Sequence, residues 1–475
     1  MDYLIFAVGA TLPDASQEWE GASYAGPAHL LSRRNNEIVV EVGDPDAAFA
    51  RLTYEIGADV VTLESDISGQ ASLRYVVRDD RIYVASHDIL LAPYLPFEID
   101  EQSCAELQRV GWSTGGYSLI KGIEVCRGGE LVHVSPSGAE RNPVQFPTGS
   151  ASDQVDLCLN FFGARLPSGQ VTVELSAGFD SRAALAATLA CKPASDVRAF
   201  SEGPIDSQDV VVAQKICELH GIAFTHRQTP DNPVDAILDN WSRMSVNNNG
   251  HIEVNILASQ GDNENTVCGD GGEIFRGFFY PYLPFQRLVG GVRGTALEAI
   301  SKKLGGSDRL TASVDRLAGE TEAETMDRFY LAERFGVWNQ KLFRSGGHRI
   351  SPFYARAAMV DLGNGLDTSL HVKLINAYLP ETKHIPINGE ASPSLYGRGT
   401  FASAKLEAEI LAAKVKRRLV KKSDLADSRG NAMIEVMKSI PKGFLYEEGE
   451  GWANLGAQRF LQMYREASHG ISQKR

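Results

Sequence analysis

The chain has 475 residues, of which 43% are hydrophobic and 23% are charged, so it is long enough to bury a full core. Its 47 basic and 60 acidic residues give a net charge of −13, which argues against non-specific nucleic-acid binding as its main role. Because the sequence contains no run of about 18 apolar residues and no basic secretory leader, we expect neither a membrane span nor an export signal.

Residues 1 to about 145 are predicted to be rich in β-strands. The acidic pair Asp79-Asp80 separates two apolar runs and predicts the turn of a hairpin. The stretch 142–152 contains two prolines and predicts a linker. The expected strands are 38–42, 72–77, 81–86 and 130–134.

From about residue 155 the pattern changes, because short strands now alternate with helices. This alternation predicts βαβ units and a parallel sheet. In the second helix, Val212, Ile216 and Leu219 have helical spacing and are expected to share one face. The expected strands are 171–175, 197–200, 222–226 and 265–268, and the expected helices are 181–191 and 207–220.

After about residue 285 the sequence is mostly helical in character. A helix is expected at 401–422, and its last turns carry six basic residues. These charges are interpreted as a solvated face that complements the negative end of the helix dipole. A docking site for an acidic partner is the alternative.

The cysteine pattern favours the cytoplasm. No two cysteines form a C-x-x-C pair, and most lie in apolar runs, so they are interpreted as buried free thiols rather than disulfides or zinc ligands. His87 and His251 are similarly interpreted as packed histidines, although acid–base roles are open to them. The six cysteines are Cys104, Cys126, Cys158, Cys191, Cys217 and Cys268.

The most informative segment is 171–185, VTVELSAGFDSRAAL, in which a strand ends in a small turn and a helix begins at once. Gly178 allows a close approach to an anion, and the helix start offers free N–H groups and a positive dipole end. Ser176 and Ser181 add hydroxyl groups. Asp180 suits a phosphate site only if a cation such as Mg²⁺ lies between the two groups. An ordinary strand–turn–helix is the alternative.

A second segment, 266–280, reads TVCGDGGEIFRGFFY and again places a Gly-rich acidic turn after a strand. Ligands of doubly wound sheets collect beyond the carboxyl ends of the strands. The two turns are therefore expected to face each other, with Asp180 and Glu273 as paired oxygen ligands for Mg²⁺.

These two segments resemble motifs of the asparagine synthetase superfamily, which includes asparagine synthetase B-like enzymes, β-lactam synthetases and lasso-peptide cyclases. That family carries S-G-G-x-D-S and S-G-D/E-G-x-D. Here the first motif has Ala177 in place of a glycine, and the second has Cys268 and Glu273 where serine and aspartate are usual. Stretches 207–221, 349–353, 73–93 and 118–130 are also similar.

The resemblance implies an α/β and α+β fold in two domains. Residues 1–150 would form a degenerate Ntn-glutaminase-like β sandwich. Residues 151–475 would form a doubly wound parallel sheet of the adenine nucleotide alpha hydrolase-like (PP-loop) type, the synthetase domain, with a helical C-terminal extension.

The resemblance also implies site roles for the matching residues. Asp270 would face an acyl-adenylate and act on the attacking amine, and Asp180 and Glu273 would hold Mg²⁺. Arg182 is expected near a phosphate. The residues expected to bind ATP are Ser176, Ala177, Gly178, Phe179, Asp180 and Ser181 at the pyrophosphate and Phe200, Ser201, Cys268 and Gly269 at adenosine.

Two departures from the family pattern qualify these roles. Glutamine-using members carry a cysteine after the initiator Met1, where this chain has Asp2, so an N-terminal thiol nucleophile is absent. The family also places a lysine late in the chain to stabilise developing charge, and Lys373, Lys383 and Lys405 are three candidates for it.

The resulting hypothesis is an ATP- and Mg²⁺-dependent ligase that adenylates a carboxylate and joins it to an amine without using glutamine. The substrates would be small-molecule or peptide carboxylates and amines, and a homo-oligomer or a biosynthetic partner protein is compatible with this reading. A nucleobase-modifying enzyme is a second hypothesis, weakened by the acidic charge. A degenerate, non-catalytic homologue acting as a nucleotide-binding or complex scaffold is the third.

Overall fold

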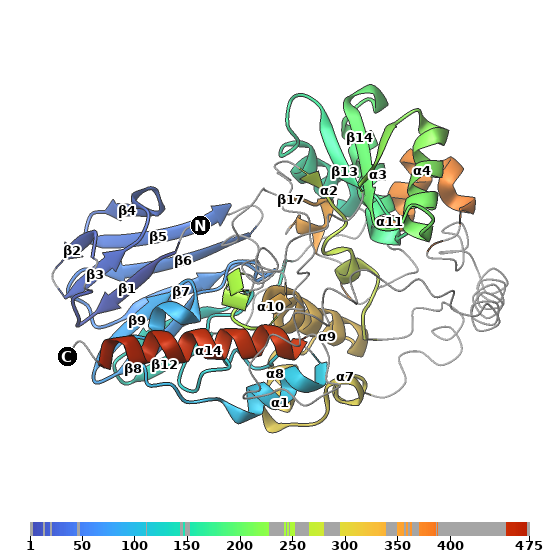
Figure 1. The fold of residues 1–475 in the computed structure, drawn as a ribbon. Helices are drawn as coiled ribbons and strands as arrows, with labels where there is room; N and C mark the ends of the chain where they lie inside the picture. Colours follow the sequence, from blue (N-terminus) through green and yellow to red (C-terminus); the bar gives the residue numbers. More distant parts are fainter. Residues whose placement is uncertain are drawn as a thin grey trace.

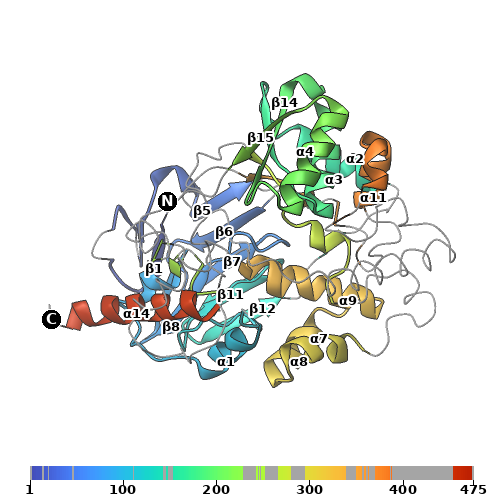
Figure 2. The same ribbon diagram turned by 45° about the vertical axis from the view of Figure 1, so that its right-hand side comes forward.

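The computed structural model shows a mixed α/β protein with two antiparallel sheets and one parallel sheet (Figure 1). The antiparallel sheets lie together at one side, and the parallel sheet with its helices lies at the other (Figures 1 and 2). The structure describes residues 3–12, 15–19, 21–44, 48–110, 112–142, 146–147, 153–227, 242–243, 245–246, 248–251, 266–279, 295–338, 349–355, 358–359, 362, 370–385, 387 and 453–472.

The two antiparallel sheets pack face to face because each strand alternates apolar and polar side chains. Phe6, Leu52, Leu63 and Val84 are among the side chains that fill the space between them. The first sheet has the order β10(Glu124–Val125), β8(Arg74–Arg78), β9(Arg81–Ala85), β1(Ile5–Val8), β3(Ala22–Ala25), β2(Gln17–Trp19), and the second β12(Gly138–Asn142), β11(Leu131–Ser135), β7(Val61–Ser65), β6(Ala48–Glu55), β5(Glu37–Asp44), β4(Leu31–Arg34).

The predicted hairpin at Asp79-Asp80 is confirmed. β8 and β9 pair antiparallel, and both turn residues have positive φ values of 51° and 59°. Aspartate tolerates this left-handed backbone better than most residues. The other predicted strands of this half are present as β5 and β11, whereas β1 to β4, β6, β7, β10 and β12 were not predicted.

The parallel sheet has the strand order β15(Ala223–Arg227), β14(Val197–Glu202), β13(Val171–Glu174), β16(Thr266–Val267), β17(Arg349–Ile350). The chain leaves β13 towards β14 and β15 and later returns to the other side of β13 as β16. The order therefore reverses between β13 and β16, which creates a switch point at the carboxyl ends of these two strands.

The helices between these strands are α3(Phe179–Cys191) and α4(Gln208–His220), in agreement with the prediction. α4 is capped by the Ser207 hydroxyl and ends at Gly221, whose φ of 65° suits glycine. The predicted apolar face of α4 is partly wrong. Ile216 is buried, but Leu219 is 52% exposed, because the helix turns Val210, Ala213 and Cys217 towards the sheet instead.

Helices follow in the later part of the chain, as expected. A π-helix at Tyr330–Phe335 continues α9, and the last described helix packs on the antiparallel half rather than on the parallel sheet. The expected helix 401–422 and the linker residues 143–145 and 148–152 lie outside the described residues. The further helices are α1(Glu101–Val110), α2(Gln154–Gly163), α7(Ala296–Leu304), α8(Asp308–Arg316), α9(Glu322–Phe329), α10(Gly336–Trp338), α11(Leu370–Tyr378) and α14(Ala453–Ser472), with short 3-10 turns at Ala28–Leu30, Asp88–Leu91, Ala194–Asp196, Gly272–Phe275 (η5), Pro352–Tyr354 and Pro380–His384.

Helix α14 covers the outer face of the first antiparallel sheet together with α1 (Figures 1 and 2). Phe460, Leu461 and Tyr464 are fully buried in a core that also contains Leu107 and Leu119. The end of the chain is thus part of the core that the first half of the chain builds.

A buried ionic network joins the antiparallel sheets to the later helices. Glu130 Oε1 accepts from Arg127 Nη2 and from Arg316 Nη1, both at 2.8 Å, and Glu130 Oε2 accepts from Arg141 Nη1 at 2.6 Å. Arg127 and Arg316 also contact Glu333 of the π-helix. The alternation of three cations and two anions satisfies charges that would be costly to bury alone.

The described residues include no helix with the length and apolar composition that crossing a membrane requires. All six cysteines are free; Cys191 is half-buried and the other five are buried, which confirms the predicted thiols. The two histidines are buried and hydrogen-bonded as predicted: His87 Nδ1 lies 2.9 Å from Ser86 Oγ, and His251 Nε2 lies 2.7 Å from Ser113 Oγ.

We predict that Phe460→Ala lowers the free energy of unfolding by about 3–5 kcal/mol, because it leaves a cavity between α14 and the first sheet. Urea unfolding of the full chain measures the change. Glu466→Ala, on the exposed side of the same helix, is the control and should shift stability by no more than about 0.5 kcal/mol. Equal stability of the two variants would show that α14 does not contribute to this core.

The Glu130 network predicts a pH dependence of stability. Burial favours a raised pKa for Glu130, but Arg127, Arg141 and Arg316 outweigh it and hold the pKa below the ordinary value. A lowered folded-state pKa stabilises the protein above the unfolded-state pKa of about 4.3, and this contribution is lost as the pH falls through the folded-state pKa.

Glu130→Gln should therefore be less stable than the original chain by about 3–5 kcal/mol at pH 7, since it leaves buried arginines uncompensated. The difference should stay constant down to about pH 4.3 and then shrink. Urea unfolding between pH 3 and 7 tests this, and a difference that grows on acidification would contradict it.

Candidate functional site

The two acidic turns predicted from the sequence meet at the switch point of the parallel sheet. They are in direct backbone contact at glycines: a Cβ atom on Gly269 would lie 2.5 Å from Ser181 N and 2.6 Å from Asp180 C. A Cβ on Gly272 would lie 2.5 Å from Asp180 Oδ1. Only glycine permits this approach at both positions, so the glycines of the second turn determine how closely the two turns pack.

The first turn is held in shape by its own hydroxyl groups. Ser176 Oγ lies 2.9 Å from Ser181 Oγ and accepts from Gly178 N at 3.0 Å. Ala177 N donates to Asp209 Oδ1 at 2.8 Å, so this amide is bound within the protein. α3 begins at Phe179, and no side-chain hydrogen bond caps its first turn. The positive end of the α3 dipole therefore lies at this turn.

Asp180 is the most strongly engaged carboxylate of the site. Arg276 Nε donates to its Oδ1 at 2.9 Å, and Arg276 Nη2 donates to its Oδ2 at 3.1 Å. His371 Nε2 donates to Oδ1 at 2.8 Å. Burial favours a raised pKa for Asp180, but the charge of Arg276 and the hydrogen bond from His371 outweigh it and lower the pKa. Asp180 is thus an ionised carboxylate with both oxygens bound.

His371 is fixed in place by aromatic packing. Its ring is fully buried and stacks between Phe179 and Phe353, with centroid distances of 4.7 and 4.6 Å. Burial lowers its pKa despite the contact with Asp180. Because its partner is a carboxylate oxygen, Nε2 is the donor of this hydrogen bond. Within the described part of the chain, its Nδ1 has no hydrogen-bond partner.

Glu273 lies on the short 3-10 turn η5, beside Asp180. Burial and the negative charge of Asp180 raise the pKa of Glu273, which places the two carboxylates within each other's field. Arg276 and Arg334 oppose this shift. Gly272, the residue before Glu273, lies against the Asp180 side chain, so the two turns converge as predicted, whereas the role of Asp180 and Glu273 as metal ligands stays a prediction.

The carboxylates of Asp180 and Glu273 are ligands that suit Mg²⁺. At present, however, the Arg276 guanidinium binds both oxygens of Asp180. Mg²⁺ prefers one or two carboxylates and completes its shell with water and phosphate oxygens. The described residues contain no cluster of three or more His, Cys, Asp or Glu side chains that could hold a metal ion. Asp180 and Glu273 would therefore fit Mg²⁺ once Arg276 has left Asp180.

Asp270 is tied to the end of the sheet. Its Oδ2 accepts from Cys268 Sγ at 3.2 Å and lies 3.3 Å from Arg349 Nε, and its main-chain oxygen accepts from Ser351 Oγ at 2.7 Å. Arg349 also pairs with Glu174 at the end of β13. The carboxylate predicted to act on an amine thus lies between a thiol and a guanidinium.

The residues expected at adenosine lie at the same sheet edge. Phe200 and Ser201 are both buried on β14, and the Arg227 guanidinium lies 3.6 Å from the centroid of the Phe200 ring. The expectation for Arg182 is wrong. Its fully buried guanidinium donates to the main-chain oxygens of Ile385 at 2.8 Å and Thr382 at 3.3 Å, because α3 turns this side chain into the core.

Several residues at the site were not predicted to belong to it. Arg276 and His371 bind Asp180, Asp209 binds the first turn, and Glu174 pairs with Arg349. Arg276 follows the second turn by three residues and Asp209 follows the helix cap Ser207, so proximity in sequence is a usable signal for both. His371 carries no such signal. Of the three candidate lysines, Lys373 lies on α11, the Lys383 side chain is not described, and Lys405 lies outside the described residues.

The comparisons with known proteins place few constraints on this site. No family model matches the chain, and no curated protein matches it. A solved structure of glutamine phosphoribosylpyrophosphate (PRPP) amidotransferase from B. subtilis, complexed with ADP and GMP, is 10% identical, and the match covers 59% of this chain and 61% of that chain with a TM-score of 0.14. The fold itself defines the chain as a mixed α/β protein that contains a parallel sheet.

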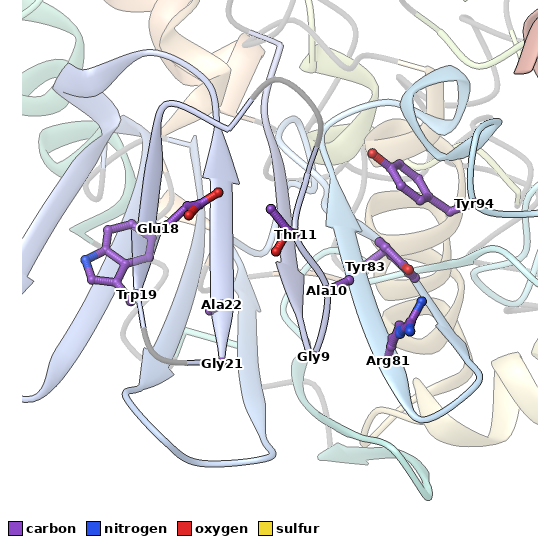
Figure 3. Close-up of a pocket in the computed structure, with 10 residues that line it drawn as sticks. All are labelled: Gly9, Ala10, Thr11, Glu18, Trp19, Gly21, Ala22, Arg81, Tyr83 and Tyr94. Atoms are coloured by element: carbon purple, nitrogen blue, oxygen red, sulfur yellow. The ribbon is translucent and has the colours of Figure 1, made fainter. Parts of the chain in front are cut away.

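A hollow of about 580 Å³ lies elsewhere, at the edge of the first antiparallel sheet (Figure 3). Tyr83 and Tyr94 stack along one wall, with ring centroids 4.5 Å apart. Arg81 and Glu18 are on opposite sides of the hollow (Figure 3). None of its lining residues belongs to the two acidic turns, so the hollow is separate from the predicted site.

We predict that Gly269→Ala destabilises the protein by about 1–3 kcal/mol, since the added methyl group would collide with the backbone of Asp180 and Ser181. Urea unfolding measures this change. Gly169→Ala is the matched control, because no heavy atom lies within 4 Å of a Cβ placed there. If both variants unfold at the same urea concentration, the two turns are not in backbone contact.

Proposed function

We propose that the chain is an ATP- and Mg²⁺-dependent, amide-forming ligase of the asparagine synthetase type. The observation that supports this most directly is the backbone contact between the two acidic turns, which brings Asp180 and Glu273 together at the switch point of a doubly wound sheet. Helix α3 directs its positive end at the same place, and this is where an anion is best stabilised.

In this proposal, the first turn binds the pyrophosphate part of ATP through Ser176, Gly178, Ser181 and the first amides of α3. Adenosine lies against Phe200, Ser201, Cys268 and Gly269 at the ends of β14 and β16. Asp209 positions the first turn through the amide of Ala177. The phosphate contacts would then come from groups that are held rigid before ATP arrives.

The reaction takes place in two steps. A carboxylate oxygen of the substrate attacks the α-phosphorus, and the bond to the β-phosphate breaks with release of pyrophosphate. An amine then attacks the acyl carbon, the carbon–nitrogen bond forms, and AMP leaves with the electrons of the broken bond. Mg²⁺, held by Asp180 and Glu273, would supply charge neutralisation for the departing pyrophosphate.

Asp270 is proposed to accept the proton that the attacking amine loses. A carboxylate can act as a base only in its ionised form. Arg349 favours that form because its positive charge lies beside the Asp270 carboxylate. Arg349 would act as a positioning residue because it also contacts Glu174 on β13.

The antiparallel half is proposed to be a glutaminase-like sandwich domain of the Ntn type that has lost its activity and serves as a scaffold. Burial raises the pKa of Cys104 to about 12 and also raises that of Cys126, so neither thiol in this half is a ready thiolate. The amine would therefore come from the substrate or from ammonia rather than from glutamine. A cytoplasmic location follows from the same reading of the free thiols.

A second candidate function is a nucleotide-binding or complex scaffold without turnover. The observation that favours it is the engagement of both acidic groups: Asp180 is paired with Arg276, and Asp270 is paired with Arg349. While Arg276 stays paired with Asp180, a metal ion has to compete with a guanidinium for this carboxylate.

ATP–pyrophosphate exchange on the full chain, with Mg²⁺ and a panel of amino acids and peptide carboxylates, tests the ligase. Asp180→Asn should reduce exchange by about 10²-fold or more. It removes a charged ligand of the Mg²⁺ that would neutralise the departing pyrophosphate. Asp59→Asn, exposed on the antiparallel half, is the control and should leave exchange unchanged.

Calorimetric titration with Mg-ATP separates the two candidates. Binding without exchange for any acid would favour the scaffold, and exchange that survives Asp180→Asn would contradict the metal assignment. Absence of Mg-ATP binding would overturn the ligase and any nucleotide-binding role.

A further inference from the structure

The inference concerns Arg276, which occupies the place that a metal ion would need beside Asp180. Two of its nitrogen atoms bind the two carboxylate oxygens, at 2.9 and 3.1 Å. Paired contacts of this kind are the strongest that a guanidinium makes with a carboxylate. A divalent cation that binds Asp180 has to compete with these two contacts and with the positive charge of the guanidinium.

The charges around the site explain why a positive group such as Arg276 is needed there when no ligand is bound. Gly272, the residue before Glu273, packs against the Asp180 side chain, so the two acidic residues lie close together and their like charges would repel. His371 contributes a hydrogen bond to Asp180 Oδ1 at 2.8 Å. Arg276 therefore supplies positive charge next to both carboxylates.

The two partners of Asp180 differ in their freedom to move. His371 is fully buried between the rings of Phe179 and Phe353 and cannot leave without breaking that packing. Arg276 stands at the end of η5, its side chain is 26% exposed, and Gly277 follows it with a φ of 75°. The guanidinium is thus partly exposed to solvent, whereas His371 is enclosed and keeps Asp180 oriented.

We propose that Arg276 is the resident counter-ion of Asp180, that it competes with divalent cations for this carboxylate, and that nucleotide binding moves its guanidinium from Asp180 to a phosphate group. The proposal rests on the proposed function for its second half. A triphosphate offers paired oxygens to a guanidinium, and the arriving divalent ion takes over the neutralisation of Asp180 and Glu273. No covalent step is involved.

The test uses Mn²⁺ alone as the probe, with the full chain and without nucleotide, and follows free Mn²⁺ by electron paramagnetic resonance. Arg276→Met keeps most of the side-chain stem and removes the charge. It should bind one Mn²⁺ at least about tenfold more tightly than the original chain, because the competing cation is gone. Arg198→Met, which removes an exposed arginine of β14, is the control and should not change Mn²⁺ binding.

Two further variants decide the assignment. Adding Asp180→Asn to Arg276→Met should abolish the gain, which shows that the new ion is at Asp180. Arg276→Gln keeps a hydrogen bond to Asp180 without the charge and should show the same gain, so the test does not depend on the folding of the methionine variant. If neither neutral variant binds Mn²⁺ more tightly than the original chain, the counter-ion role is wrong.

The outcome is independent of the ligase proposal. If the neutral variants gain Mn²⁺ but the original chain shows neither Mg-ATP binding nor exchange, the competition at Asp180 stands and the ligase fails. If exchange is found but the variants gain no Mn²⁺, the ligase stands and the role of Arg276 fails.

Discussion

The backbone contact between the two Gly-rich turns is the constraint on which the rest of the site depends. Gly269 and Gly272 allow the second turn to lie directly on Asp180 and Ser181. This contact brings two carboxylates together where solvent is partly excluded, and such a pair needs positive charge nearby. Arg276 provides it, and His371 holds Asp180 in the required orientation. The strand order brings the two turns together, the glycines set how closely they pack, and the resulting pair of carboxylates requires the positive charge of Arg276.

The remainder of the chain holds this arrangement from two sides. α11 brings His371 to Asp180. The π-helix carries Tyr330 and Arg334 near Glu273 and carries Glu333 into the ionic network with the antiparallel half. A π-helix widens one helical turn, so neighbouring side chains point in directions that a regular helix would not allow. One short segment therefore touches both the candidate site and the sandwich.

The antiparallel half depends on segments that are distant in sequence. Its outer face is covered by α14, near the end of the chain, and its inner ionic network is completed by Arg316 and Glu333. The two halves of the chain are consequently joined by a common hydrophobic core and by buried ion pairs. The packing and charge pairs of the antiparallel half are therefore completed by later segments of the chain.

The local sequence pattern was sufficient to predict the elements that are stabilised mainly by interactions between residues close in sequence. Alternating strands and helices from 171 to 227, the hairpin at Asp79-Asp80 and the two acidic turns follow from periodicity, turn residues and glycine spacing. The strands β1 to β4, β6, β7, β10 and β12 did not follow, because their pairing partners and the opposite sheet provide most of their stabilisation.

The sequence by itself determined that Asp180 and Glu273 end up near each other, since parallel strands direct their following turns to one edge. Only the tertiary structure decided what surrounds them. Arg182 directly follows Ser181, a predicted phosphate contact, but points into the core, whereas His371, almost two hundred residues from Asp180, donates a hydrogen bond to it. The direction of a side chain depends on how its helix packs, and packing is a property of the whole fold rather than of the local sequence.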